Sequence, residues 1–258
     1  MTYEQQEMFQ KKLGGFATLK SVQVLSALAF FQKECGIHDI ARLTGLSTST
    51  IHRILCEFIG CGLAVKIGKK YHCGVMVRAL FQVVTDDNYL LKASEREMDR
   101  LNDLTKETVH LIGQENCDAV YLAKRDAQNQ IGLRSIVGKH VPMYCTSGGK
   151  LLLAYQSAEW LQNYYDRVPL EMLTENTLTS PKALEEELSR IKKQGYAVDN
   201  SEHNPDVVCV AAPVFFPDGK LACTIGVATP KYRMTDEKME LFIRESVQSA
   251  KAITEHLK

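Results

Sequence analysis

The sequence predicts an α+β protein in which a small helical domain precedes a larger domain built on a mostly antiparallel sheet. Three observations lead to this prediction. Helical spacing of apolar residues dominates up to about residue 105, alternating β-branched residues begin at about residue 108, and the two parts carry opposite net charge. The chain has 258 residues, of which 45% are hydrophobic, so it is long enough for two globular domains.

The charge is unevenly distributed, although the whole chain is neutral with 31 basic and 31 acidic side chains. Residues 1–81 carry 10 lysines and arginines against 5 acidic residues, which leaves the remainder with a net charge of −5. Positive charge confined to one part is typical of a protein in which that part alone contacts phosphates.

The expected organisation has four parts, which are a flexible arm (1–15), the small helical domain (16–74), a linker helix region (75–92) and the larger domain (93–258). No apolar run is long enough to span a membrane, and the first residues are too polar for a signal peptide, so we expect a cytoplasmic protein without membrane contact. Eight cysteines are scattered without a C-x-x-C pair, which favours buried thiols over disulfides or a structural metal site.

The helical part begins with a scaffold helix at residues 19–31 and continues with two short helices within residues 37–60. Gly45 ends the first of these short helices, and Ser47 is placed to cap the second. The residues expected to face the core are Val22, Leu25, Leu28 and Ala29 in the scaffold helix, Ile40, Ala41 and Leu43 in the next, and Ile51, Ile54, Leu55 and Phe58 in the third. This pattern describes a helix-turn-helix.

Residues 63–73 predict a hairpin of two short strands with a basic tip. Two helices around a glycine turn occur in many small domains, but a basic hairpin directly after them is the order of a winged helix-turn-helix that binds duplex DNA. In the hairpin we expect Leu63, Val65 and Tyr71 to face inward and Lys66, Lys69 and Lys70 to face outward. The expected DNA-binding residues are Ser47, Thr48, Ser49, Thr50, His52 and Arg53 on the recognition helix and Lys69 and Lys70 on the hairpin.

Helical spacing continues after the hairpin over residues 75–85, the linker helix, and 89–105. The apolar face of the linker helix could join two subunits or pack on its own domain, and it consists of Val75, Val77, Leu80, Phe81 and Val84. Alternating strands are predicted at 108–114, 118–126 and 131–137, helices at 147–155, 159–166 and 181–194, strands at 196–200, 207–216 and 221–229, and a closing helix at 235–257.

Four strings in this order, GLSTSTIHRIL, CTSGGKLLLA, GYAVDNSEH and CVAAPVFFPDGK, resemble the IclR family of bacterial transcriptional regulators. The resemblance extends from about Thr18 to Ile253 and is most specific between Gly195 and Pro213. It implies a C-terminal domain of the PAS or GAF type that binds a small-molecule effector, often an organic or sugar acid. It also implies a homodimer or tetramer that acts on double-stranded operator DNA as a repressor or activator. We expect no cofactor and no metal.

Residues 146–149, Thr-Ser-Gly-Gly, precede a predicted helix, where free backbone N–H groups and the positive end of the helix dipole favour a carboxylate. From the residues alone, a tight turn capped by Ser147 explains the pattern at least as well, and Asp199 and Cys209 could be a solvated turn acid and a core thiol. The family resemblance favours ligand contact. The expected effector-binding residues are Ser147, Gly148, Gly149, Asp199, Cys209, Gly226, Ala228, Leu133 and Val141.

The chain departs from the family pattern at several positions. Asp206 stands where a glycine is usual, Val208 replaces a common arginine near the expected pocket mouth, and Thr48 replaces a frequent lysine on the recognition helix. Gly226 and Ala228 are small where some members are polar, so we expect them to leave room for a larger or less polar ligand. These departures keep the identity of the effector and the operator sequence open.

The alternative to a regulator is an enzyme that acts on a small carboxylate. Asp199, His203 and Cys209 could serve as acid, base and nucleophile or as metal ligands, and Cys145 with His140 could form a second pair. Neither set is accompanied by a nucleophile-elbow pattern, a phosphate loop, a dinucleotide fingerprint or paired metal-ligand spacing. We therefore expect a regulator without enzymatic activity.

Overall fold

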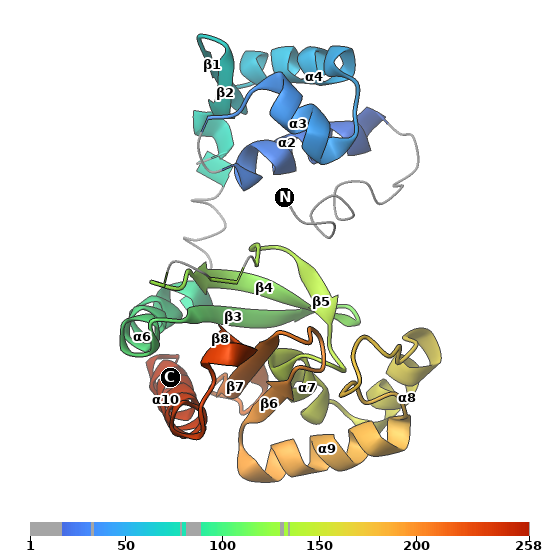
Figure 1. Ribbon diagram of the computed structural model, residues 1–258, viewed down its shortest axis with the longest axis vertical. Helices are drawn as coiled ribbons and strands as arrows, with labels where there is room; N and C mark the ends of the chain where they lie inside the picture. The colour runs from blue at the N-terminus through green and yellow to red at the C-terminus, as the bar shows by residue number, and fades with distance from the viewer. Residues whose placement is uncertain are drawn as a thin grey trace. The chain divides into compact units, whose positions relative to one another are not determined.

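The structure is a computed structural model that describes residues 17–31, 34–77, 79–80, 89–129, 132–133 and 135–257. These residues form two compact units, unit 1 up to residue 80 and unit 2 from residue 89 (Figure 1). The arm predicted at residues 1–15 lies outside the described residues, as do Phe81 and Val84 of the linker face.

Unit 1 contains three helices and a hairpin, in the order α2 (Ala17–Phe30), α3 (Ile37–Thr44), α4 (Thr48–Gly60), β1 (Ala64–Ile67) and β2 (Lys70–Cys73). Gly45 ends α3 with φ of 71°, in the left-handed region where glycine has no steric penalty. The Ser47 side chain accepts a hydrogen bond from the Thr50 N–H and caps α4. The predicted helix-turn-helix and hairpin are confirmed.

The core of unit 1 contains the predicted stripe of α4 and, from α3, Ile40 and Leu43. Two predictions about facing were wrong. Val22 of α2 is 54% exposed and Ala29 is also exposed, because the helix turns Val24, Ala27 and Leu28 inward. This helix is apolar on more than one side, so periodicity alone does not select the buried face. In β1, Ala64 is buried and Val65 is 44% exposed, because adjacent strand residues face opposite sides.

The described part of the linker, residues 75–77 and 79–80, is helical. Val75, Met76 and Leu80 are exposed in this segment, at 75%, 45% and 56% of their full surface. Of the predicted face, Val75 and Leu80 are therefore largely exposed, whereas Val77 is half-buried.

Unit 2 is built on a six-stranded sheet with the order β5-β4-β3-β8-β7-β6, in which all neighbours are antiparallel. The strands are β3 (Thr108–Glu115), β4 (Asp118–Arg125), β5 (His140–Pro142), β6 (Ala197–Asn200), β7 (Val207–Phe215) and β8 (Leu221–Pro230). The predicted α+β class with an antiparallel sheet is confirmed.

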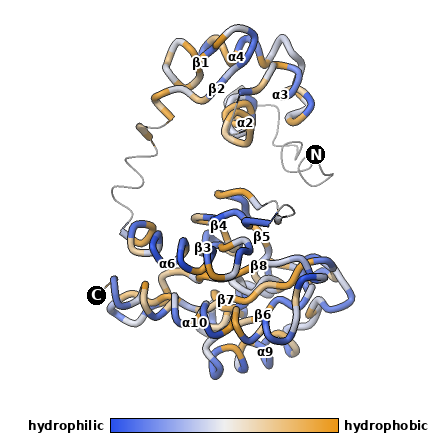
Figure 2. The backbone as a smooth tube through the Cα atoms, turned by 60° about the vertical axis from the view of Figure 1, so that its left-hand side comes forward, coloured by the Kyte–Doolittle hydropathy of each residue, from blue (hydrophilic) through white to orange (hydrophobic). Residues whose placement is uncertain are grey.

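Helices cover both faces of this sheet (Figure 1). On one face lie α6 (Tyr89–Thr105) and α10 (Asp236–His256), and on the other lie α7 (Ser147–Ala154), α8 (Ala158–Arg167) and α9 (Pro181–Gln194). A short 3-10 helix, η1 (Lys231–Arg233), leads from β8 into α10. Hydrophobic and hydrophilic stretches alternate along α9 and α10, as expected for helices that turn one side to the sheet (Figure 2).

One predicted strand was wrong. The described residues within 131–137 form a loop, and the edge strand is the later segment β5. The Lys124 ammonium donates hydrogen bonds to the carbonyls of Leu133 and Ser135, at 3.4 and 2.9 Å, so a side chain satisfies backbone groups that a strand ladder would otherwise pair. No helix among the described residues is long and apolar enough to cross a membrane.

Candidate functional site

The exposed face of α4 carries the predicted DNA-binding side chains. Thr48, Ser49, His52 and Arg53 are exposed and Thr50 is half-buried. The Ser47 hydroxyl lies 3.1 Å from the Ser49 hydroxyl and 2.9 Å from the Thr50 hydroxyl while it caps the helix. Ser47 is thus already engaged in capping, and Arg53 is the cation that this helix offers to a partner.

The hairpin carries further basic side chains, some of them at consecutive positions. Gly68 forms its tip with φ of 60°, Lys69 is exposed and Lys70 is half-buried. The Lys66 ammonium lies 5.6 Å from the centre of the Tyr71 ring, in cation–π range. Tyr71 itself is buried and exchanges backbone hydrogen bonds with Cys35, which fixes the hairpin to the helical core.

In unit 2, the N-terminus of α7 is buried and has no side-chain cap. Every residue of α7 is buried, and Thr146 at the N-cap turns its hydroxyl to the Pro142 carbonyl, at 2.8 Å. The first helical hydrogen bond runs from the Lys150 N–H to the Thr146 carbonyl, so the three preceding N–H groups, on Ser147, Gly148 and Gly149, have no partner inside the helix. Ser147 is the first helical residue and not the cap.

The two glycines allow α7 to lie directly against the sheet. A Cβ atom at Gly148 would lie 2.6 Å from Cδ1 of Ile112 and 2.7 Å from Oγ1 of Thr224, and one at Gly149 would lie 2.4 Å from the Cα of Met143. The Thr224 hydroxyl, which the Gly148 backbone approaches, is buried and has no hydrogen-bond partner among the described residues. A buried polar group of this kind is available to a ligand or water.

Four strands present one row of side chains on the sheet face that α7 covers. The register pairs Asp199 of β6 with Cys209 of β7, Cys209 with Ala228 of β8, and Ala228 with Thr108 of β3. Paired residues on neighbouring strands project to the same face. The structure therefore brings together three predicted site residues and adds Thr108, whose hydroxyl is buried without a partner among the described residues.

Other predicted site residues have different roles. A Cβ atom at Gly226 would lie 2.3 Å from the carbonyl oxygen of Val210, so this glycine allows close strand packing. The expectation that Gly226 leaves room for a ligand was wrong. Val141 is 3% exposed and belongs to the core beside α7, and Leu133 lies in the loop that Lys124 holds. Val208, which was expected near the pocket mouth, is buried on the face of the sheet opposite to Cys209.

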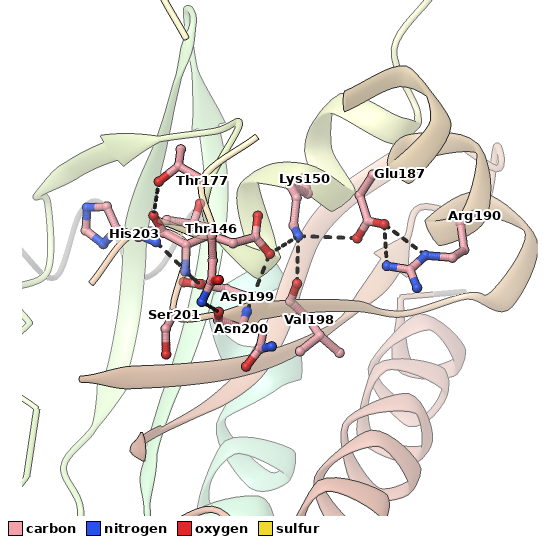
Figure 3. A network of polar contacts seen from close by, with 12 residues as sticks. Thr146, Lys150, Thr177, Glu187, Arg190, Val198, Asp199, Asn200, Ser201 and His203 are labelled. Carbon is pink, nitrogen blue, oxygen red and sulfur yellow. Dashed lines mark hydrogen bonds and ion pairs between the residues drawn. The ribbon is translucent and has the colours of Figure 1, made fainter. Parts of the chain in front are cut away.

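Asp199 is 3% exposed and holds the turn that follows β6. Its Oδ1 atom accepts hydrogen bonds from the N–H groups of Glu202, at 2.7 Å, and His203, at 3.4 Å (Figure 3). Burial raises the pKa of Asp199 to about 7, against the opposing effect of these hydrogen bonds. Burial also raises the pKa of the neighbouring Cys209 thiol well above its usual value.

A buried ion-pair network behind Asp199 was missed in the sequence analysis. The Lys150 side chain is 1% exposed, and its ammonium contacts Oε1 of Glu202 at 2.5 Å, the Val198 carbonyl at 2.7 Å and Oε1 of Glu187 at 3.3 Å (Figure 3). Arg190 pairs with the other oxygen of Glu187. A single lysine within the apolar helix KLLLA was the available signal.

His110 of β3 is a second residue that was missed. Its Nε2 atom lies 2.5 Å from the Ser135 hydroxyl, and its ring centre lies 4.5 Å from that of Tyr121. Burial lowers the pKa of His110 to about 3, so the imidazole is neutral at physiological pH. A histidine at an alternating position between Val109 and Leu111 was its signal in the sequence.

The alternative catalytic sets gain no support from the geometry. Burial raises the pKa of the Cys145 thiol, and that of Cys209, which is opposite to the activation of a nucleophilic thiolate. In the described ranges, no three His, Cys, Asp or Glu side chains are grouped so that they could hold a metal ion.

Comparison with known proteins gives matches over both units. Residues 17–68 match the profile described as IclR helix-turn-helix domain, and residues 82–255 match the one described as Bacterial transcriptional regulator IclR C-terminal. The HTH-type transcriptional regulator KdgR of Escherichia coli is 28% identical over 240 residues, which cover 92% of this chain and 91% of KdgR. These matched proteins and profiles are transcriptional regulators, not enzymes.

Solved structures agree. The IclR crystal structure from Thermotoga maritima superposes with a TM-score of 0.77 and 27% identity, covering 92% of this chain and 97% of that one. An IclR homologue from Microbacterium hydrocarbonoxydans, solved in complex with 4-hydroxybenzoate, has a TM-score of 0.73 and 20% identity, covering 94% of this chain and 99% of that one. At this lower identity, the second comparison supports the fold alone.

Proposed function

Because the chain belongs to the IclR family of bacterial transcriptional regulators, which combine a helix-turn-helix with a ligand-binding C-terminal domain, we propose a specific division of work. Unit 1 binds operator DNA through α4 and the hairpin. A small organic acid binds unit 2 at the start of α7 and changes the operator affinity.

The observation that best supports DNA binding is that the exposed face of α4 carries hydroxyl groups and an arginine and is followed by a basic hairpin. The N-terminal residues of a recognition helix reach base edges in the major groove, and arginine can bind a guanine with two hydrogen bonds. Arg53 and Thr48 are placed for this readout. Lys69 at the hairpin tip is placed for phosphates, which fix position but carry no sequence information.

The test of DNA binding starts from a selection of duplexes from a random library with the full chain. On the selected duplex, Arg53→Ala should weaken binding by about 1 to 3 kcal/mol and relax the sequence preference. Lys69→Ala should weaken binding to all duplexes and reduce the slope of log affinity against log salt by about 1. If both variants bind as the parent does at every salt concentration, DNA binding through this face is contradicted.

The observation that best supports effector binding is the N-terminus of α7, which has no side-chain cap and lies inside the core of unit 2. A helix N-terminus buried without a cap requires partners for its N–H groups, and a carboxylate satisfies them and the helix dipole together. The unpartnered hydroxyls of Thr224 and Thr108 and the Asp199–Cys209 pair supply additional polar contacts on the sheet face. This arrangement favours a small acid that also carries hydroxyl groups.

The acid can change the operator affinity only if two DNA-binding units can adopt two relative arrangements and the acid binds the protein more tightly in one of them. Typical coupling is about 1 to 3 kcal/mol, or roughly a five- to 150-fold change in operator affinity. The test adds pyruvate, gluconate and 4-hydroxybenzoate separately to the full chain on its selected duplex. A change in affinity with any of them supports the proposal. No change, together with no thermal shift of the free protein, contradicts an organic-acid effector of this size.

Specific binding at physiological salt also needs more than one winged helix, so we propose that the active form is a homodimer or a tetramer. The exposed Val75, Met76 and Leu80 of the linker helix support a seam between subunits there. Val75→Asp with Leu80→Asp should shift the sedimentation coefficient to that of a monomer, and the exposed Met172→Asp should not. A parent protein that sediments as a monomer at micromolar concentration, with and without duplex, would rule out this assembly.

A further inference from the structure

The described basic side chains around the candidate effector site already have partners. The Lys150 ammonium has three N–H groups and makes three hydrogen bonds, to Glu202, Glu187 and the Val198 carbonyl. Lys124 is held by Asp126, at 2.6 Å, and by two loop carbonyls. His110 is neutral because burial lowers its pKa to about 3. Among the described residues, Lys150 and Lys124 are therefore already paired with carboxylates and carbonyl groups.

Asp199 lies in this site as an additional acid. The titratable groups around its carboxyl come from several elements, namely Cys209 on β7, Tyr121 on β4, Cys145 before α7, Lys150 on α7, and Glu202 and His203 in the following turn. Of these, the only lysine is neutralised by two carboxylates. The Asp199 carboxyl accepts hydrogen bonds from two backbone N–H groups, and both are made to the same oxygen, Oδ1. No basic side chain in the described residues forms an ion pair with Asp199.

From this geometry we infer that the site selects organic acids with a single negative charge, and that Asp199 carries a proton and donates it in a hydrogen bond when such a ligand is bound. The inference rests on the proposed function. A ligand carboxylate at the start of α7 and an ionised Asp199 would place two like charges in one buried site, where the described lysines, Lys150 and Lys124, already pair with other carboxylates. Such a pair of like charges is unfavourable. One proton on Asp199 removes this repulsion and turns a repelling acceptor into a donor.

Two properties follow for binding. A second negative charge on the ligand would meet lysines that, within the described part of the site, already pair with carboxylates, so dicarboxylates and phosphorylated acids should bind far more weakly than matched monocarboxylates. The affinity for a monoanion should also fall by about tenfold for each pH unit once Asp199 ionises in the free protein, because binding then requires the uptake of one proton. Burial places that ionisation at a pKa of about 7.

The protonation of Asp199 can be tested without any ligand. The infrared difference spectrum of the parent minus Asp199→Asn should show the carbonyl stretch of a protonated carboxyl group at about pH 6, and the band should be lost above about pH 8. Asp206→Asn, which removes an exposed carboxylate from the turn before β7, should leave this band in place. Absence of the band at about pH 6 overturns the inference.

Selectivity is tested with three matched pairs of acids, which are pyruvate and phosphoenolpyruvate, gluconate and glucarate, and 4-hydroxybenzoate and terephthalate. For any monoanion that binds, we expect at least tenfold weaker binding of its dianionic partner and a loss of affinity above about pH 7. Asp199→Asn should bind the monoanion without this pH dependence. Equal binding of both members of a pair, or a pH-independent affinity of the parent, contradicts the inference.

The two proposals fail in different ways. If none of the six acids binds at any pH, the organic-acid effector is contradicted, and the infrared band still decides whether Asp199 is protonated. If a monoanion binds and Asp199→Asn keeps the pH dependence of the parent, the effector site stands and the role of Asp199 is wrong.

Discussion

The helices α4 and α7 begin with similar residues but differ in capping and in burial. In α4, Ser47 caps the helix with its own hydroxyl, and the following side chains lie on the surface of unit 1. In α7, the hydroxyl of Thr146 turns away from the helix, glycines replace side chains, and the whole helix is buried against the sheet.

The difference separates two ways of making a binding site from a helix. A capped and exposed helix leaves recognition to its side chains, which suits a partner as large as DNA. An uncapped and buried helix offers its backbone N–H groups, which suits a small anion that can enter the core. If α4 and α7 differ in this way, substitutions in and around the two helices should have clearly unequal effects on stability.

The largest effect is expected from the buried ion pairs of α7. Lys150→Met leaves the buried Glu202 carboxylate without its cation and leaves Glu187 with Arg190 alone, and it should lower the free energy of unfolding of unit 2 by about 3 to 5 kcal/mol. Urea unfolding followed by the fluorescence of Trp160, the single tryptophan, measures this unit. Arg190→Met removes an exposed cation from the same Glu187 and should cost less than about 1 kcal/mol. Similar costs for both variants would show that the Lys150 network is not a buried one.

Glycine replacements should have opposite effects in the two helices. Gly149→Ala places a methyl group against the Met143 backbone and should destabilise unit 2 by about 1 to 3 kcal/mol. Gly60→Ala, at the end of α4, meets open space and should stabilise unit 1 by about 0.5 to 1 kcal/mol. Far-UV circular dichroism with Trp160 fluorescence follows both units. Destabilisation by Gly60→Ala as large as that by Gly149→Ala would remove the proposed contrast in packing.

The stability of unit 2 should depend on pH through Asp199. Its pKa is raised to about 7 in the folded protein, above the ordinary value of about 3.9, so the folded state binds the proton more tightly. Its stabilising contribution is complete below about pH 4 and is lost as the pH rises through 7, by at most about 1.4 kcal/mol per pH unit. The urea midpoint of the parent should therefore fall relative to that of Asp199→Asn as the pH rises through this window. Outside the window, the two midpoints should depend on pH in the same way. Parallel curves across it would show an unperturbed carboxyl.

A small effect is expected at the cap of α4. Ser47→Ala removes the acceptor for the Thr50 N–H and should lower the stability of unit 1 by about 1 kcal/mol. Hydrogen exchange of peptides from α4 should become faster, and Ser47→Asp, which keeps an acceptor at the cap, should leave it slow. Unchanged exchange in Ser47→Ala would mean that the cap does not hold this helix end.

The sequence allowed good prediction where local rules act alone. The bounds of α6 and α9 were predicted correctly, because helical spacing, a proline at the first turn and Gly195 at the end of α9 are local signals. The edge strand β5 was placed too early, since the choice depends on pairing with β4 and on the hydrogen bonds of Lys124.

The candidate site was only partly predictable for the same reason. Asp199, Cys209 and Ala228 were identified, but their row across β6, β7 and β8 depends on strand register. The register also brings in Thr108, which lies far earlier in the chain. The role of Gly226 was misjudged because a missing side chain can leave room or allow close packing, and only the position of the neighbouring strand distinguishes them. Lys150 finds its partners on α9 and after β6, far along the chain.

We propose that the effector acid binds the backbone N–H groups at the start of α7. The most direct measurement is an amide correlation spectrum of the full chain labelled with ¹⁵N-glycine, recorded while adding whichever of pyruvate, gluconate or 4-hydroxybenzoate raises the thermal midpoint. We expect the largest shifts at the Gly148 and Gly149 amides, with the amides of Gly113 and Gly219 in the same unit little changed. An acid that stabilises the protein while the Gly148 and Gly149 amides stay unshifted would contradict the claim.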